Sequence, residues 1–164
     1  DLYLVGNLPY YITTPIIDHI ISQKIKFKKF TIMVQKEVAD RFMAQSESKD
    51  YGYITLVLRY YFKIKKVCDV SRFAFNPVPK VESRVISFVL RDDIPNIDSN
   101  KYFQFLKIAF KQKRKNLKNN LNGLYDLSKV EEILKKYGLD LSVRAEALDE
   151  KILIEIFKSV INDS

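Results

Sequence analysis

Short apolar runs alternate with helical patterns along the first part of the chain. Residues 2–5 and 30–34 are almost continuously apolar, which is typical of strands buried on both faces. Between them, Thr14 and Pro15 suit the start of a helix, and isoleucines follow at helical spacing up to residue 21. We also expect a helix over residues 36–45. The pattern thus predicts two strands, each followed by a helix.

Two later segments, residues 53–62 and 85–90, are rich in β-branched and aromatic side chains, so we expect strands there. Strand, helix, strand, helix and two closing strands together predict half of an α/β sheet. The polar segment 91–100 contains Pro95 and predicts a linker. We therefore place a first domain over residues 1–92.

Beyond the linker the pattern becomes helical, and we place a small all-α domain over residues 98–164. Apolar residues recur on one side of a single predicted helix: Phe103, Leu106, Phe110, Leu117 and Leu121. Gly123 would end this helix. Two further helices are expected near residues 128–137 and 149–161.

The basic residues are concentrated in this first helical segment. The chain has 28 Lys and Arg against 20 Asp and Glu, and a formal charge of +8. Residues 101–125 contain no acid, so like charges on the predicted helix repel without compensation. The predicted stripe consists of Lys107, Lys111, Arg114 and Lys118. It is either a solvated face or, as we favour, a surface for a polyanion, with nucleic acid as the default partner.

Several classes of protein are excluded by composition. Cys68 and His19 are the only residues of their kinds, which removes disulfides, cysteine zinc clusters and histidine metal sites, so we expect no metal. We expect Cys68 to be small and buried. The four glycines are scattered and form no Gly-rich nucleotide loop. No apolar run approaches the roughly 18 residues of a membrane span.

The first candidate site is Asn7-Leu8-Pro9-Tyr10, directly after the first predicted strand. Ligands of open α/β sheets gather at this end of the strands. The Asn7 amide oxygen and the Leu8 carbonyl could accept both hydrogens of an exocyclic NH₂, which localises the nitrogen lone pair for methyl transfer. Pro9 would fix the turn, and a base could stack on Tyr10. The alternative is a plain turn in which Asn7 bonds its own backbone.

The second candidate is the segment 73–83, in which Pro77 and Pro79 stiffen an extended loop. Such a loop could hold Phe75 over a pocket, so that a base lies between Phe75 and Tyr10. Lys80 and the nearby Arg84 could contact phosphates. The alternative is a rigid connector whose phenylalanine fills the core.

Together these motifs resemble the ribosomal RNA adenine dimethyltransferases, and specifically the small-subunit (KsgA-type) enzymes. The resemblance covers nearly the whole chain in order. It rests on Asn7-Leu8-Pro9-Tyr10, Gln35-Lys36-Glu37-Val38, Phe75-Asn76-Pro77-Val78-Pro79-Lys80-Val81-Glu82-Ser83, Phe110-Lys111-Gln112-Lys113-Arg114-Lys115-Asn116-Leu117, Asn119-Asn120-Leu121 and Arg144-Ala145-Glu146.

The resemblance implies a Rossmann-like class I methyltransferase sheet, here its C-terminal half, followed by a helical domain. It implies N6,N6-dimethylation of two adjacent adenosines near the 3′ end of small-subunit (16S) rRNA, with S-adenosylmethionine as donor, in cytoplasmic ribosome biogenesis. Asn7 would lie beside both cofactor and target amine. Leu8 would present its carbonyl, and Tyr10 and Phe75 would stack the base.

In the family most of the cofactor site lies upstream of the motif at Asn7, where this chain begins. We therefore expect the chain alone to bind S-adenosylmethionine negligibly, to be inactive, and to self-associate through an exposed sheet edge. Two other functions remain open. One is a large-subunit rRNA adenine methylase of the macrolide-resistance type, and the other is a non-catalytic rRNA-binding assembly factor.

Overall fold

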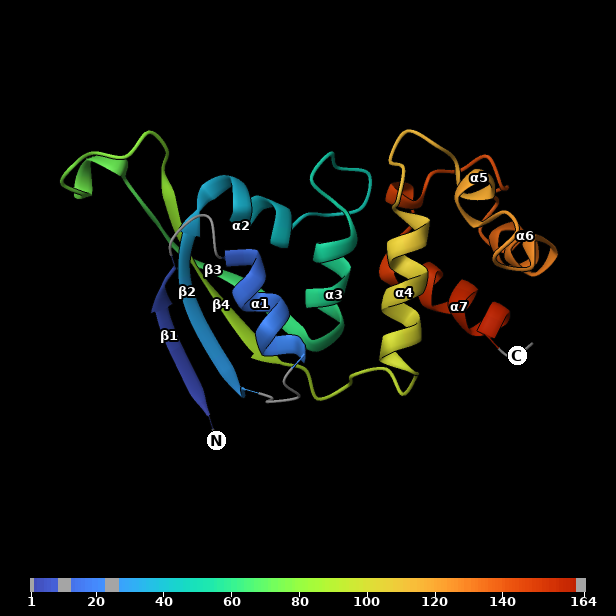
Figure 1. Cartoon of the computed structure of the whole chain (residues 1–164), viewed down its shortest axis with the longest axis horizontal. Coiled ribbons are helices and arrows are strands. Elements are labelled where there is room, and N and C mark those ends of the chain that lie inside the picture. Colours follow the sequence, from blue (N-terminus) through green and yellow to red (C-terminus); the bar gives the residue numbers. More distant parts are fainter. Residues whose placement is uncertain (1, 9–12, 23–26, 162–164) are drawn as a thin grey trace. The chain divides into compact units, whose positions relative to one another are not determined.

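The computed structural model describes residues 2–8, 13–22 and 27–161, and the chain divides into two compact units. The first unit comprises residues 1–43 and 58–94, and the second comprises residues 44–57 and 95–164 (Figure 1). The division near residue 94 falls within the expected linker. Residues 44–57, however, belong to the second unit, although they precede the linker in the sequence.

The first unit contains a four-stranded mixed sheet. Its strands are β1 (Tyr3–Asn7), β2 (Lys29–Gln35), β3 (Phe62–Val70) and β4 (Ser83–Leu90), in the order β1-β2-β4-β3. β1 and β2 are parallel, whereas β4 runs antiparallel to both β2 and β3. The predicted α/β class is confirmed, and β1 and β3 form the two edges of the sheet.

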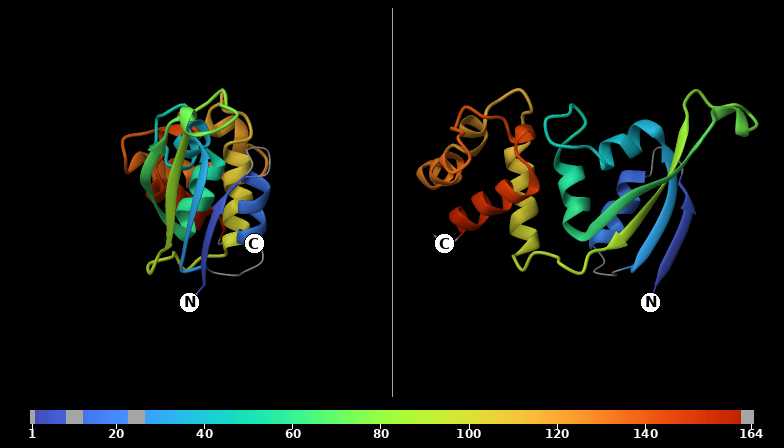
Figure 2. Two further views of the ribbon diagram at one scale, coloured as in Figure 1. Left: turned by 90° about the vertical axis from the view of Figure 1, so that its left-hand side faces the viewer. Right: turned by 180° about the vertical axis from the view of Figure 1, so that it is seen from behind.

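One face of the sheet is covered by helices α1 (Thr13–Ser22) and α2 (Lys36–Phe42), as the views in Figures 1 and 2 agree. The core beneath them is aromatic: Phe30 stacks on Phe88 with ring centroids 4.2 Å apart, and Phe62 meets Phe30 edge-on at 5.1 Å. On the other face Tyr3 is 62% exposed and Val5 is 81% exposed. Among the described residues no helix covers this face.

The predicted strand over residues 53–62 is wrong. Residues of this segment form helix α3 (Tyr53–Tyr61), and a strand begins only at Phe62. Leu56, Val57, Leu58 and Tyr60 are all buried, and the polar residues Thr55 and Arg59 lie four residues apart on one side of the helix. The prediction followed the β-branched and aromatic composition and not this helical spacing. Burial has therefore overridden the β preference of the individual side chains.

Strand β3 is absent from the elements predicted above. Its first four residues alternate apolar Phe62 and Ile64 with Lys63 and Lys65, as in a half-buried strand, and Lys66 then interrupts the alternation. Lysines on an edge strand discourage pairing with other chains. The register with β4 shifts between Lys66 and Cys68, and Cys68 is exposed, so the expectation that it is buried is also wrong.

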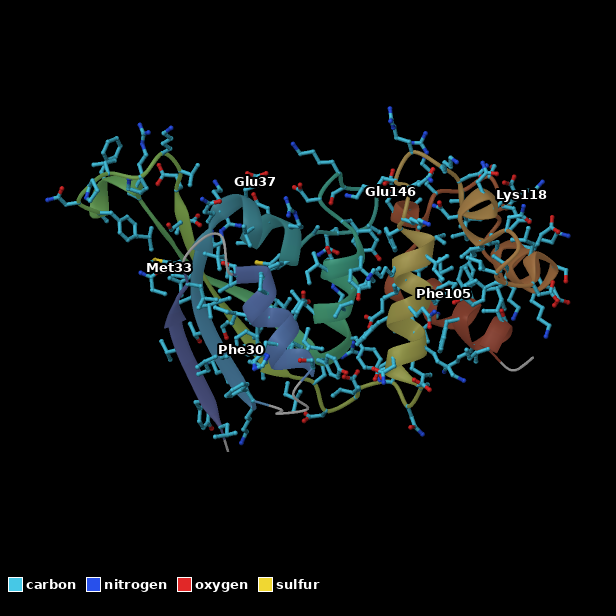
Figure 3. All side chains as sticks on the ribbon, in the orientation of Figure 1. Phe30, Met33, Glu37, Phe105, Lys118 and Glu146 are labelled. Carbon is cyan, nitrogen blue, oxygen red and sulfur yellow. The ribbon has the colours of Figure 1, made fainter. Side chains whose placement is uncertain are left out.

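The second unit is helical, with α4 (Ser99–Ala109), α5 (Leu117–Leu121), α6 (Leu127–Lys135) and α7 (Glu150–Ile161). The helices expected near 128–137 and 149–161 are confirmed as α6 and α7. Tyr102 and Phe105 are fully buried on α4 and pack against Phe157 of α7, with centroids 5.4 and 5.9 Å apart (Figure 3). These rings form the centre of the unit's core.

The single long helix predicted over residues 103–121 is wrong. α4 ends at Ala109, and a new helix begins after Asn116, whose side chain accepts a hydrogen bond from the Asn119 N–H at 2.9 Å. Asn is a preferred residue at such an N-terminal cap. The segment between the two helices, residues 110–116, is called the basic turn below.

Residues 44–57 join the second unit through specific polar contacts. The Tyr51 hydroxyl donates to the Leu148 carbonyl at 2.8 Å, and the Glu47 N–H donates to the Glu146 carbonyl at the same distance. The Lys113 ammonium donates to the Lys49 carbonyl at 3.1 Å. Each of these hydrogen bonds joins residues that are far apart in sequence, so the local sequence pattern does not predict that residues 44–57 belong to the second unit.

Within the described residues, every helix is too short or too polar to cross a lipid bilayer.

Candidate functional site

Asn7 is the last residue of β1, and Leu8 follows it at the edge where β1 and β2 both end. Because the two strands are parallel, Asn7 lies opposite Met33 of β2. The Leu8 N–H donates to the Met33 carbonyl at 3.3 Å, which anchors Leu8 to the neighbouring strand. Asn7 is exposed, and its side chain makes no hydrogen bond to any residue that the structure describes.

A cavity of about 350 Å³ joins this edge to the loop between β3 and β4. Asn7, Leu8 and Met33 line one side of it, and the loop supplies the remaining lining residues: Phe75, Asn76, Pro77 and Pro79. The structure therefore brings Asn7 and Phe75 into one cavity, although they are far apart in sequence. The volume lies within the usual range of small-molecule sites.

Phe75 follows a single 3₁₀ turn, Arg72–Ala74, which begins directly after β3. The ring is half-buried, unlike that of its neighbour Phe73, which is 70% exposed. The Phe75 N–H donates to the Arg72 carbonyl at 3.3 Å. Phe75 thus lines the cavity and does not fill the core of the sheet.

The cavity offers two kinds of interaction to a ligand. The Asn7 side chain has an amide oxygen, which can accept a hydrogen bond, and Phe75 has an apolar ring on which a flat base can stack. Stacking of a base on an aromatic side chain contributes roughly 1–3 kcal/mol. Pro9 and Tyr10, the other two residues of the predicted motif, lie outside the described residues.

The predicted basic stripe is distributed over three local structures and does not lie on one helix. Lys107 is on α4, Lys111 and Arg114 are in the basic turn, and Lys118 is on α5 (Figure 3). All four side chains are exposed. The Asn120 side-chain amide donates to the carbonyls of Ala109 at 2.9 Å and Gln112 at 3.2 Å, and so braces the basic turn.

Lys80 and Arg84, both predicted to contact phosphates, differ in their surroundings. Lys80 is exposed on the loop between β3 and β4. The Arg84 side chain is only 13% exposed and donates to Asp69 at 2.7 Å and to Asp40 at 2.8 Å. The hydrogen bond from Arg84 holds the pKa of the Asp69 carboxyl below its ordinary value. Because its guanidinium already has two carboxylate partners, we do not include Arg84 among the phosphate-binding residues.

Comparison with known proteins identifies the family of the chain. The model of the family described as "Ribosomal RNA adenine dimethylase" matches residues 1–162. The chain belongs to this family. The small-subunit methyltransferase A of Mycoplasma mobile is 40% identical over 154 residues, which are 94% of this chain and 61% of that protein. The chain spans between half and two-thirds of the length of the curated relatives it matches.

Two solved structures extend the comparison to the fold. A dimethyladenosine transferase from Plasmodium falciparum superimposes with a TM-score of 0.79 at 26% identity, over 95% of this chain and 66% of that chain. The 23S rRNA methyltransferase ErmE gives a TM-score of 0.73 at 24% identity, over 97% and 65%. The fold of this family member is therefore Rossmann-like in its sheet-containing unit.

Met33 is the residue of the cavity that sequence reasoning missed. It lies inside an apolar run and was assigned to a buried strand, although it is half-buried at the edge of the cavity. Its position could have been found from topology, because the strand parallel to β1 must end beside Asn7. In this family member residues from both parallel strands, β1 and β2, therefore line the cavity.

Proposed function

We propose that the complete protein transfers methyl groups from S-adenosylmethionine to N6 of two adjacent adenosines near the 3′ end of small-subunit rRNA, during ribosome biogenesis in the cytoplasm. The observation that carries this proposal is the cavity shared by Asn7, Leu8 and Phe75. Membership of the ribosomal RNA adenine dimethylase family and the names of the curated relatives support the choice of substrate.

Asn7 and Leu8 act on the target amine. The lone pair of an adenine NH₂ is delocalised into the ring, which makes the nitrogen a poor nucleophile. The Asn7 amide oxygen and the Leu8 carbonyl accept its two hydrogens and draw the nitrogen toward tetrahedral geometry. The lone pair would then bond to the methyl carbon as the carbon–sulfur bond of the donor breaks and leaves its electron pair on sulfur, and a proton would leave the resulting cationic nitrogen. No general base is required before the attack.

In this proposal Phe75 and Tyr10 hold the purine during methyl transfer. Phe75 presents its ring from the loop between β3 and β4, and Tyr10 would present a second ring from the other side. Pro9 would restrict the backbone of the motif, because the proline ring fixes its φ angle. Orientation of this kind lowers the barrier by keeping the reacting atoms together.

The cofactor supplies an electrophilic methyl group when it is bound. Asn7, at the carboxyl end of β1, is the residue of this chain that we assign to its site, because ligands of open α/β sheets bind at that edge. We place the rest of the site in the part of the complete protein that this chain does not span.

The basic residues bind the RNA backbone in this proposal. Lys107, Lys111, Arg114 and Lys118 are exposed in the second unit, and Lys80 is exposed on the loop that carries Phe75. Contacts of this kind fix the position of the RNA, whereas the cavity selects the base.

A methylation assay with the complete protein tests this function. We expect N6,N6-dimethyladenosine to form on small-subunit rRNA and not on large-subunit rRNA, because the curated relatives are small-subunit enzymes by name. Product on large-subunit rRNA alone would favour the macrolide-resistance type. Tight RNA binding without any methyl transfer would favour an assembly factor.

The chain of residues 1–164 studied alone should bind S-adenosylmethionine too weakly to detect by calorimetry, while the complete protein binds it. Micromolar affinity in residues 1–164 would contradict this expectation.

We also propose that the open edge of β1 pairs with a second copy when the chain is alone, because β1 is an edge strand of the sheet and hydrogen-bonds to β2 on one side only. Sedimentation velocity that finds a monomer at all concentrations would contradict this.

A further inference from the structure

The loop of residues 71–82 extends beyond the ends of β3 and β4, and the views in Figures 1 and 2 agree on this. Two of its apolar side chains are largely exposed: Phe73 is 70% exposed and Val78 is 52% exposed. Apolar burial is therefore a weak constraint on this loop. Yet Phe75, which the loop carries, must keep a defined place if it is to stack on a base.

Glu82 links the two ends of the loop. Its carboxylate accepts a hydrogen bond from the Arg72 N–H at 2.6 Å. The carbonyl of Arg72 in turn accepts from the Phe75 N–H at 3.3 Å. Arg72 is thus bonded to the Glu82 carboxylate through its N–H and to the Phe75 N–H through its carbonyl. Hydrogen bonds to an ionised acceptor are about twice as strong as neutral ones.

The backbone of Glu82 also joins the loop to the opposite side of the cavity. Its carbonyl accepts from the Lys36 N–H at 3.0 Å. Lys36 begins α2 directly after β2, the strand that carries Met33. The side chain of Glu82 therefore bonds to the turn before Phe75, while its main chain bonds to the first residue after β2, the strand that carries Met33.

Arg84 fixes the base of the loop. It lies directly opposite Asp69 in the register of β3 and β4, and its guanidinium contacts the carboxylates of Asp69 and Asp40. Asp40 belongs to α2, so this one side chain joins three elements. The low exposure of the Arg84 side chain, 13%, reduces competition from water.

We propose that Glu82 and Arg84 are positioning residues, which hold the loop of residues 71–82 so that Phe75 stays at the wall of the cavity. Glu82 orients the turn before Phe75, and Arg84 fixes the strands from which the loop leaves. The purpose of this arrangement rests on the proposed function, because a stacking ring needs a fixed place only if a base binds there.

Amide hydrogen exchange measured by NMR on the complete protein tests the role of Glu82. In Glu82→Ala we expect the Arg72 and Phe75 amides to exchange roughly tenfold faster, since a hydrogen bond to a charged group is lost. The Ile32 and Phe88 amides in the sheet should not change. Glu82→Gln keeps an acceptor oxygen and should restore most of the protection.

The matched control is Glu37→Ala, which removes an exposed carboxylate from α2 in the same unit. It should leave the Arg72 and Phe75 amides unchanged. Exchange at these amides that is equal in the wild type and in Glu82→Ala would overturn the assignment of Glu82. A general increase that includes Ile32 and Phe88, and is not rescued by Glu82→Gln, would assign Glu82 to stability of the whole unit.

Arg84→Lys tests the second positioning residue, because Lys keeps the charge but cannot contact two carboxylates in the same fixed geometry. We expect faster exchange from Val70 to Phe75, again without change at Ile32. Unchanged exchange in this segment would overturn the role of Arg84. These measurements do not depend on activity, so they remain decisive even if the complete protein transfers no methyl group.

Discussion

Replacing Asn7 with alanine should abolish methyl transfer by the complete protein while leaving its affinity for RNA nearly intact. In the proposed mechanism the amide oxygen of Asn7 is one of the two acceptors that localise the lone pair of the target nitrogen. Removal of one such preorganised polar group typically lowers kcat by roughly 100–1,000-fold. We propose that RNA affinity comes mainly from the basic residues of the second unit, which the substitution does not touch. Single-turnover kinetics and filter binding measure the two quantities separately.

The position of Asn7 makes this variant easy to interpret. The side chain is exposed and makes no hydrogen bond within the described residues, so its loss should not destabilise the sheet. Asn96→Ala, at an exposed asparagine in the segment between β4 and α4, is the matched control and should behave as the wild type. Full activity in Asn7→Ala would contradict the mechanism. An equal loss of activity and RNA affinity would assign Asn7 to RNA binding.

Replacing Lys111, Arg114 and Lys118 together with alanine should reduce the salt dependence of RNA binding. Each phosphate contact contributes roughly 0.7–0.9 to the slope of log affinity against log salt concentration, so the slope should fall by about two to three units. All three side chains are exposed, and Lys111 and Arg114 lie in the turn that Asn120 braces. Affinity measured at several salt concentrations gives the slope directly.

A control of equal charge separates specific contacts from net charge. Lys135, Lys136 and Lys151 are also exposed in the second unit, and their replacement removes three positive charges as well. This control variant should keep the slope of the wild type. If the slope of the first variant is unchanged, the basic turn and α5 do not contact the RNA. If both variants lower the slope equally, the chain binds RNA through its overall charge.

The strands and helices with a clear pattern could be predicted from the sequence. β1 and β2 are short apolar runs, and α1, α6 and α7 have helical spacing with recognisable ends. Gly138, with a φ of +70°, follows the end of α6 as expected of a helix-terminating glycine. In these elements the local preference and the tertiary environment agree.

The errors arose where tertiary contacts decide the local structure. α3 contains many residues that prefer strands, but it is buried on most sides and its polar residues Thr55 and Arg59 are four positions apart, as a helix requires. The break between α4 and α5 has no proline or glycine to mark it. It depends on the cap at Asn116 and on the hydrogen bonds of Asn120, both of which can be seen only once the turn has formed.

The cavity could be predicted only in part. The chemistry expected of Asn7 and Phe75 predicts that they share one site, and the structure places both in the same cavity. Their roles in binding a base remain predictions. The roles of Glu82 and of the two partners of Arg84 could not be assigned from sequence, because they follow from strand order and register.

Photo-crosslinking of the complete protein to small-subunit rRNA that carries 8-azidoadenosine at the target adenosines tests the central claim most directly. If the cavity receives the adenine ring, mass spectrometry should find the crosslinked nucleoside on the segments that contain Asn7 to Tyr10 and Phe75. Crosslinks confined to the second unit, with none on either segment, would show that the target base binds elsewhere.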